Sequence, residues 1–152
     1  MSEAKAPRAR IVALDLEGTL ISNAMSQFPR PGLWGFITFC LERFERTVVY
    51  TAVRPARARA VLELLAREGD APEAFAAVEI VAWSGPVKDL RLIPGVGEAR
   101  WREAVLVDDL EQYVAPGQAS QWVPVEPWVS PYDANDRELE RVQRVLASRA
   151  GD

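Results

Sequence analysis

Two acidic residues, Asp15 and Glu17, directly follow an apolar run at residues 11–14 and precede a Gly-Thr pair. A short apolar run bounded in this way is typical of a buried strand in a parallel sheet, and ligands bind beyond the carboxyl ends of such strands. Residues two apart in a strand point the same way, so both carboxylates would face one site, and Gly18 permits the tight turn that follows. Paired carboxylates can act as nucleophile and general acid/base, or bind a metal. Taken alone, the pair also fits two solvated acids at the end of a surface strand.

Further polar groups follow other segments in the same way. Thr51 ends a second apolar run, and Lys88 follows a Trp-Ser-Gly-Pro turn. Asp108 and Asp109 end a third apolar run. The carboxyl ends of parallel strands share one edge of the sheet, so these groups are expected to meet there. A hydroxyl, an ammonium and four carboxylates would offer oxygen ligands to Mg²⁺ and hydrogen-bond donors to phosphate oxygens.

The elements that must position these groups alternate between strands and helices, which predicts a doubly wound, mainly parallel α/β sheet. Residues 111–132 contain four prolines, a density that excludes a long helix and indicates an irregular segment along the sheet edge. Strands are expected at residues 11–14, 48–51, 78–82, 104–107 and 121–125.

Three helices are expected between and after these strands. Pro31 fits the first turn of a helix with apolar residues at spacings of three and four. Pro55 opens a second helix, which stops at Gly69. Asp133 or Asn135 would cap the last helix.

Composition limits the class of protein. The chain has 152 residues, which fits one domain over residues 10–150 after a flexible leader at 1–9. It contains no histidine, which excludes His-based triads, and its single cysteine, Cys40, lies among apolar residues of a predicted helix. A net charge of −4 does not favour nucleic-acid binding. No signal peptide or run of eighteen apolar residues occurs, so no membrane partner and a cytoplasmic location are expected.

The order acid-x-acid-Gly-Thr, then Thr, then Lys, then Asp-Asp resembles the four motifs of the haloacid dehalogenase superfamily of phosphohydrolases. Within it, residues 30–36, 44–52, 87–90 and 107–109 resemble the small phosphatases related to the carboxy-terminal-domain (NLI-interacting-factor-like) protein phosphatases. The resemblance implies a Rossmann-like α/β fold and a phosphatase that depends on Mg²⁺. Residues 20–50 and 52–87, which separate the first three motifs, leave no room for a large cap domain. A capless site of this superfamily is open to exposed phosphates.

The resemblance also assigns roles by position. Asp15 would be the nucleophile that forms an aspartyl-phosphate, and Glu17 the general acid/base in place of the superfamily's usual Asp. The implied catalytic residues are Asp15, Glu17, Thr51 and Lys88; the substrate-binding residues Thr51, Ala52, Arg54 and Lys88; and the metal ligands Asp15, Glu17, Asp108 and Asp109. Glu17 would contribute its backbone carbonyl to the metal.

Two other interpretations use the same residues. Receiver domains of two-component signalling combine acids, Thr and Lys, but their acidic pair precedes the phosphorylated Asp, which is the reverse of the order here. A binding or scaffold module could keep the fold with weakened catalysis, with Glu17 as the lesion. The substrate is left open by the sequence: a phosphoprotein, a nucleic-acid end or a small phosphate ester.

Secondary candidates lie in loops. Arg54 and Arg30 are placed where a guanidinium could bind a substrate phosphate or carboxylate, against the alternative of structural or solvated arginines. Trp83, Trp101 and Trp128 would either line a groove or pack in the core.

Overall fold

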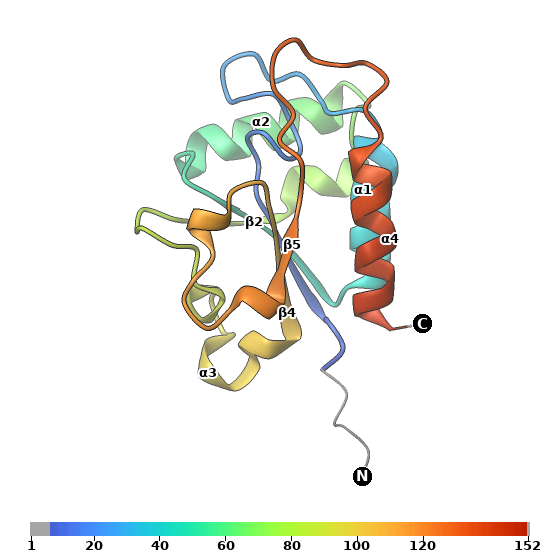
Figure 1. Cartoon of the computed structure of the whole chain (residues 1–152). Coiled ribbons are helices and arrows are strands. Elements are labelled where there is room, and N and C mark those ends of the chain that lie inside the picture. The colour runs from blue at the N-terminus through green and yellow to red at the C-terminus, as the bar shows by residue number, and fades with distance from the viewer. Residues whose placement is uncertain (1–6, 152) are drawn as a thin grey trace.

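A computed structural model describes residues 7–151 and shows a parallel sheet with helices on both faces (Figure 1). The strand order in this range is β3-β2-β1-β4-β5, and every neighbouring pair is parallel. The α/β fold predicted from the sequence is therefore confirmed. The strands are β1 (Ile11–Leu14), β2 (Arg46–Thr51), β3 (Glu79–Ala82), β4 (Ala104–Asp108) and β5 (Trp122–Pro124).

The helices complete the chain between these strands. The α-helices are α1 (Leu33–Arg43), α2 (Pro55–Arg67), α3 (Gly97–Arg100) and α4 (Glu138–Ala150). Short 3-10 helices lie at Glu73–Ala77, Leu90–Leu92, Trp101–Glu103, Glu111–Tyr113 and Ala119–Gln121. Within residues 7–151, none of the helices has the length and apolar content needed to cross a lipid bilayer.

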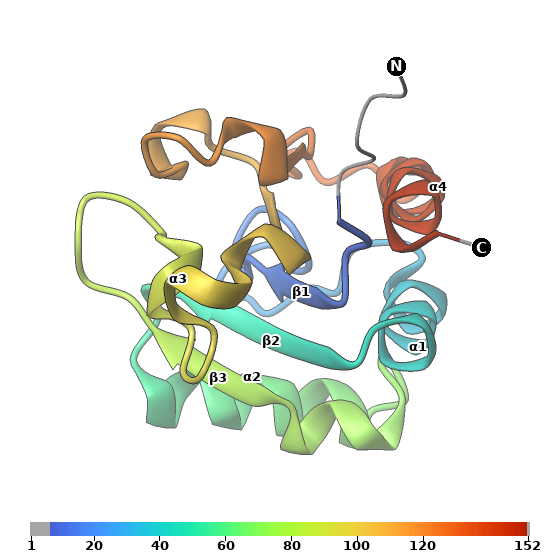
Figure 2. The same cartoon turned by 90° about the horizontal axis from the view of Figure 1, so that it is seen from below.

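The two faces of β1 pack into separate cores. Val12 and Leu14 belong to the larger core with α1, α2 and α4, whereas Ile11 and Ala13 pack with the segment that contains Trp101. This alternation is the two-residue period of a strand buried on both sides. Figure 2 shows α1, α2 and α4 on one side of the sheet and α3 on the other.

Strand register brings the predicted motifs to one level. Leu14 at the end of β1 is paired with Val49 of β2 and Val107 of β4. The next residue of β1's chain, Asp15, donates its backbone N–H to the Val107 carbonyl at 2.9 Å and so lies beside Asp108. The register alone therefore places the first and last motifs side by side at the carboxyl edge of the sheet.

Two helix starts differ from the sequence expectation. Helix α1 begins after Pro31, because Gly32 adopts a left-handed conformation (φ 85°) that no regular helix contains. Helix α4 begins at Glu138, and Asp136 accepts a hydrogen bond from the Glu138 N–H. The prediction that Asp133 or Asn135 caps this helix is wrong, because the Asp133 carboxylate instead closes a turn on the Asn135 N–H.

The predicted leader, residues 1–9, lies for the most part outside the described residues. Ala9 donates its backbone N–H to the Arg149 carbonyl at 2.9 Å, which joins the chain before β1 to the end of α4. The domain limits, 1–9 and 10–150, stay a prediction.

Candidate active site

Lys88 stands at the centre of the carboxyl edge. Its ammonium donates to the Asp15 Oδ1 atom at 2.9 Å and to the Asp108 Oδ2 atom at 2.7 Å. Only 1% of the Lys88 side chain is exposed, so both ion pairs are shielded from water. Burial opposes the charged form of Lys88, but the two carboxylates outweigh this effect and raise the pKa of the ammonium. Lys88 is therefore positively charged at neutral pH.

Two aromatic rings also pack against the Lys88 ammonium. The nitrogen lies 5.2 Å from the centre of the Trp83 ring and 5.4 Å from that of Tyr113. The Tyr113 carbonyl accepts the Lys88 backbone N–H at 2.7 Å, and the Trp83 indole N–H donates to the Val87 carbonyl. Cation–π attraction and these backbone bonds together hold the lysine in place.

Three carboxylates converge on the same point. Asp15, Asp108 and Asp109 each offer an oxygen atom, and these atoms lie within 4.8 Å of one another. Burial raises the pKa of Asp15 to about 6, partly offset by the neighbouring Lys88 charge. Burial also raises the pKa values of Asp108 and Asp109. Three carboxylates this close repel one another when they are ionised. A hard cation such as Mg²⁺ would offset their negative charge, and carboxylate oxygens are the ligands it prefers.

The other Asp15 oxygen is fixed by a residue that sequence reasoning gave no role of its own. The buried Thr19 hydroxyl donates to Asp15 Oδ2 at 2.8 Å. Both oxygens of the predicted nucleophile are thus oriented, one by Lys88 and one by Thr19. The signal in the sequence is the Gly-Thr pair after Glu17, which forms part of the first motif.

Thr51 ends β2 at the same edge and is buried. Its hydroxyl oxygen accepts the backbone N–H of Val53 at 3.0 Å, which leaves the hydroxyl proton available for a phosphate oxygen. Ala52 and Arg54 follow in an exposed loop before α2. The structure therefore places Thr51, Lys88, Asp15 and Asp108 at one edge, with Ala52 and Arg54 outside the buried cluster.

Glu17 does not join the carboxylate cluster. Strand β1 ends at Leu14, and the exposed Glu17 carboxylate accepts the backbone N–H of Ala24 at 2.7 Å. The expectation that extended backbone would direct Asp15 and Glu17 to one point is not met, because the strand ends before Glu17. The catalytic and metal-binding roles of Glu17 stay predictions.

Gly18 is required by the close approach of Asp109. The residue has φ 78°, and a Cβ atom there would lie 2.9 Å from the Asp109 Oδ2 atom. This separation is too short for two non-bonded atoms, so any side chain at residue 18 would displace the Asp109 carboxylate. The glycine therefore links the turn after Asp15 to the geometry of the acidic cluster.

Gly18→Ala should reduce stability by about 1–2 kcal/mol, because an alanine resists the left-handed conformation. It should also weaken Mg²⁺ binding by displacing Asp109. Gly69→Ala is the matched control, since Gly69 has φ 79° and nothing within 4 Å of its Cβ position. Thermal denaturation and Mg²⁺ titration of both variants should show a common loss of stability and a loss of Mg²⁺ affinity in Gly18→Ala alone. Equal Mg²⁺ affinities would contradict this account.

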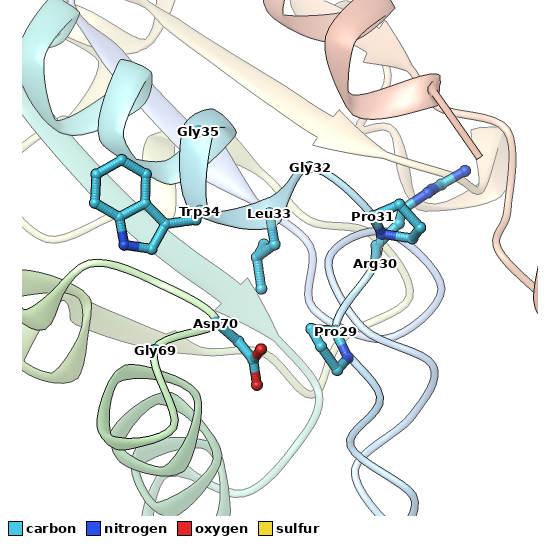
Figure 3. A pocket seen from close by; sticks show the side chains of 9 residues that line it. All are labelled: Pro29, Arg30, Pro31, Gly32, Leu33, Trp34, Gly35, Gly69 and Asp70. Atoms are coloured by element: carbon cyan, nitrogen blue, oxygen red, sulfur yellow. The ribbon is translucent and has the colours of Figure 1, made fainter. Parts of the chain in front are cut away.

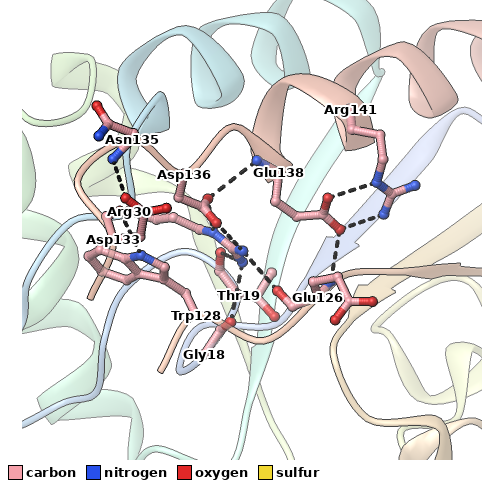
Figure 4. A network of polar contacts seen from close by, with 10 residues as sticks. All are labelled: Gly18, Thr19, Arg30, Glu126, Trp128, Asp133, Asn135, Asp136, Glu138 and Arg141. Carbon is pink, nitrogen blue, oxygen red and sulfur yellow. Dashed lines mark hydrogen bonds and ion pairs between the residues drawn. The ribbon is translucent and has the colours of Figure 1, made fainter. Parts of the chain in front are cut away.

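Arg30 holds the turn that follows Asp15 (Figure 4). Its buried guanidinium forms a two-pronged ion pair with Asp136, at 2.7 and 3.1 Å. It also donates to the carbonyls of Gly18 (3.4 Å), Thr19 (3.3 Å) and Glu126 (2.8 Å). Arg30 is thus a structural clamp between the first motif and the segment before α4, and the expectation of a substrate contact is not met.

A pocket of about 290 Å³ lies on the other side of the Arg30 backbone, between the start of α1 and the end of α2 (Figure 3). Its wall includes the half-exposed Trp34 and the Asp70 side chain, while the Arg30 guanidinium points away from it. Of the candidate residues, Arg30 alone lines this pocket, and the residues assigned to catalysis, substrate binding and metal ligation do not.

The other loop tryptophans divide between packing and the site. Trp101 and Trp128 are buried, as expected for core residues. Trp83 contacts Lys88, as described above. Trp122, on β5, donates its indole N–H to the Asp108 carbonyl at 3.0 Å and so supports the backbone of the last motif.

Comparison with known proteins agrees with this geometry. The curated proteins include no significant match to the chain. The family model of NLI interacting factor-like phosphatases matches residues 10–151, which includes every strand and all four motifs. This protein therefore belongs to the NLI interacting factor-like phosphatase family and is a phosphatase of the haloacid dehalogenase type.

Proposed function

We propose that this phosphatase is a Mg²⁺-dependent phosphomonoester hydrolase that works through an aspartyl-phosphate on Asp15. The observation that supports it best is the bridge that Lys88 forms between Asp15 and Asp108 at the edge where Asp109 also lies. One cation beside the buried carboxylates of Asp15 and Asp108 and the half-buried carboxylate of Asp109 leaves an excess of negative charge, which suits a metal ion and a phosphate bound together.

The proposed first step is attack of an Asp15 oxygen on phosphorus. Thr51 and Lys88 hold the phosphate oxygens, and the bond from phosphorus to the leaving oxygen breaks as the Asp15 bond forms. Glu17 donates a proton to the leaving oxygen, for which its carboxyl must exchange the Ala24 N–H for the substrate. Glu17 then takes a proton from water, whose oxygen attacks phosphorus and restores the Asp15 carboxylate.

The metal ligands proposed are Asp15, the Glu17 backbone carbonyl and the acidic pair. Asp108 already accepts hydrogen bonds on both oxygens, from Lys88 and from the Leu110 N–H. Asp109 is therefore the better candidate for direct ligation, with Asp108 orienting Lys88. When bound, Mg²⁺ supplies positive charge against the phosphate oxygens.

The substrate proposed is an exposed phosphate, as in a phosphoprotein, a nucleic-acid end or a small ester. The segments that separate the first three motifs, residues 20–50 and 52–87, form α1, β2, α2 and β3. Neither segment therefore contains a cap domain that could cover the site. A weakened scaffold module is the second candidate, because the Glu17 carboxylate is bound to the Ala24 N–H and lies outside the cluster.

Hydrolysis of p-nitrophenyl phosphate by the purified protein tests the proposal. We expect turnover with Mg²⁺, loss of turnover with a chelator and recovery when Mg²⁺ is added back. Turnover that persists in the chelator would contradict the metal requirement, and no turnover under any condition would favour the scaffold module.

Glu17→Gln should slow hydrolysis of alkyl phosphates by roughly 10²- to 10⁴-fold, because only the transferable proton is lost. Aryl phosphates should be less affected, since a nitrophenolate leaves without a proton. Mg²⁺ affinity should persist, because the backbone carbonyl is unchanged. Glu17→Asp, which restores the superfamily's usual acid, should remain active. Steady-state kinetics on paired alkyl and aryl esters provides the measurement, and equal impairment on both would contradict the acid role.

A further inference from the structure

A second pocket opens beside the proposed phosphate site. It has a volume of about 210 Å³ and lies between the loop after Thr51 and the end of β3. Its lining residues are Ala52, Val53, Arg54, Pro55, Ala82, Trp83 and Ser84. This volume is below the roughly 300–1,000 Å³ typical of whole small-molecule sites, so it suits one substituent of a ligand.

The pocket adjoins the phosphate site through Thr51 and Trp83. Thr51 directly precedes its first lining residue, Ala52. The Trp83 ring forms part of its wall and also lies 5.2 Å from the Lys88 ammonium. A phosphate held between Thr51 and Lys88 would therefore place its organic part within reach of the pocket. The hydrogen bond from the Trp83 indole to the Val87 carbonyl fixes this wall in advance.

Arg54 supplies the positive charge in the lining. Arg57 and Arg59, which follow it on α2, donate to the carbonyls of Ala24 and Ala76. Within residues 7–151, no hydrogen bond or ion pair holds the Arg54 guanidinium. The lining therefore combines an indole, apolar side chains and an uncommitted guanidinium, the chemistry that binds a planar or apolar group ending in an anion.

We propose that this pocket is a substrate subsite for the organic part of a small phosphomonoester that carries a carboxylate. Arg54 binds the carboxylate, and Trp83 with Val53 and Pro55 covers the apolar part between the two anionic ends. The inference rests on the hydrolase proposed above, and it narrows the substrate to molecules with a second negative group beyond the phosphate.

A matched pair of esters tests this subsite: 4-carboxyphenyl phosphate and its uncharged 4-carbamoylphenyl analogue. Wild-type protein should show a kcat/KM ratio of about five in favour of the carboxylate, the size expected for one ion pair at an exposed arginine. Arg54→Gln should reduce that ratio to about one. Arg67→Gln, the same change at the far end of α2, should leave the ratio unchanged. Comparing ratios between variants cancels any difference in leaving-group chemistry.

Binding of the corresponding non-hydrolysable benzylphosphonates, with and without the carboxylate, separates this proposal from the hydrolase. Isothermal titration should give the same Arg54-dependent preference in Kd. A preference for the carboxylate in Kd without turnover would contradict the hydrolase proposal and support the subsite. Turnover with no carboxylate preference in wild-type protein, or an equal loss in Arg54→Gln and Arg67→Gln, would overturn the subsite.

Discussion

Asp15→Asn should abolish phosphatase turnover, with a loss of at least ~10⁴-fold, the scale seen when a catalytic nucleophile is removed. The amide has nearly the shape of the carboxylate but cannot form the aspartyl-phosphate. Lys88 would keep its ion pair with Asp108, and Thr19 could still hydrogen-bond to the amide oxygen. Steady-state kinetics with p-nitrophenyl phosphate and Mg²⁺ is the measurement.

The fold of this variant should persist, so the lost activity would report chemistry. Burial already disfavours the charged form of Asp15 and raises its pKa to about 6, so a neutral side chain there removes an unfavourable charge. Thermal denaturation should confirm a cooperative transition. Residual turnover near the wild-type rate would exclude Asp15 as nucleophile and return the site to a binding role.

Lys88→Met should destabilise the metal-free protein by about 3–5 kcal/mol, the cost of leaving buried charges without their partner. Methionine fills similar space between Trp83 and Tyr113 but provides no charge for Asp15 and Asp108. Turnover should be lost as well, since the phosphate would lose its fixed cation. Urea denaturation without Mg²⁺ measures the stability change.

The effect of Lys88→Met should depend on pH in a defined direction. The ion pair with Asp15 requires an ionised carboxylate, and the pKa of Asp15 is about 6. Above pH 6 the Asp15 carboxylate is charged, so the loss of the Lys88 ammonium lowers the free energy of unfolding most. As the pH falls through 6, Asp15 gains a proton, and the difference in the free energy of unfolding between variant and wild type should shrink. Arg91→Met is the control, because its ion pair with Asp89 lies at the surface and should be worth about 1 kcal/mol or less. A cost of Lys88→Met as small as that of the control would contradict the buried bridge.

Local sequence patterns predicted most of the fold. The apolar runs that end at residues 14, 51 and 107 each predict a buried parallel strand, and the structure contains β1, β2 and β4 there. Strand identity also places the polar residue that follows at the carboxyl edge, which is why Asp15, Thr51 and Asp108 could be grouped from the sequence. Their hydrogen-bond partners could not, because those depend on side-chain orientation.

Long-range pairing accounts for the site features that sequence reasoning missed. Arg30 looked free to contact a substrate, yet its partner Asp136 lies 106 residues further along the chain. Trp83 follows β3 and Tyr113 ends a short 3-10 helix, and the two rings meet beside Lys88. The expectation that Glu17 faces the same point as Asp15 is not met for the opposite reason. A local contact with the Ala24 N–H replaces the extended backbone that the spacing implied.

The Arg30 clamp has a consequence for when the turn after Asp15 becomes fixed during synthesis. The turn at Gly18 and Thr19 leaves the ribosome early, but the Asp136 and Glu126 groups that hold Arg30 in place are translated more than a hundred residues later. A nascent chain therefore carries Asp15 before it carries the residues that fix the turn after it. The turn at Gly18 and Thr19 should therefore become fixed only after the segment around residue 136 has emerged and docked.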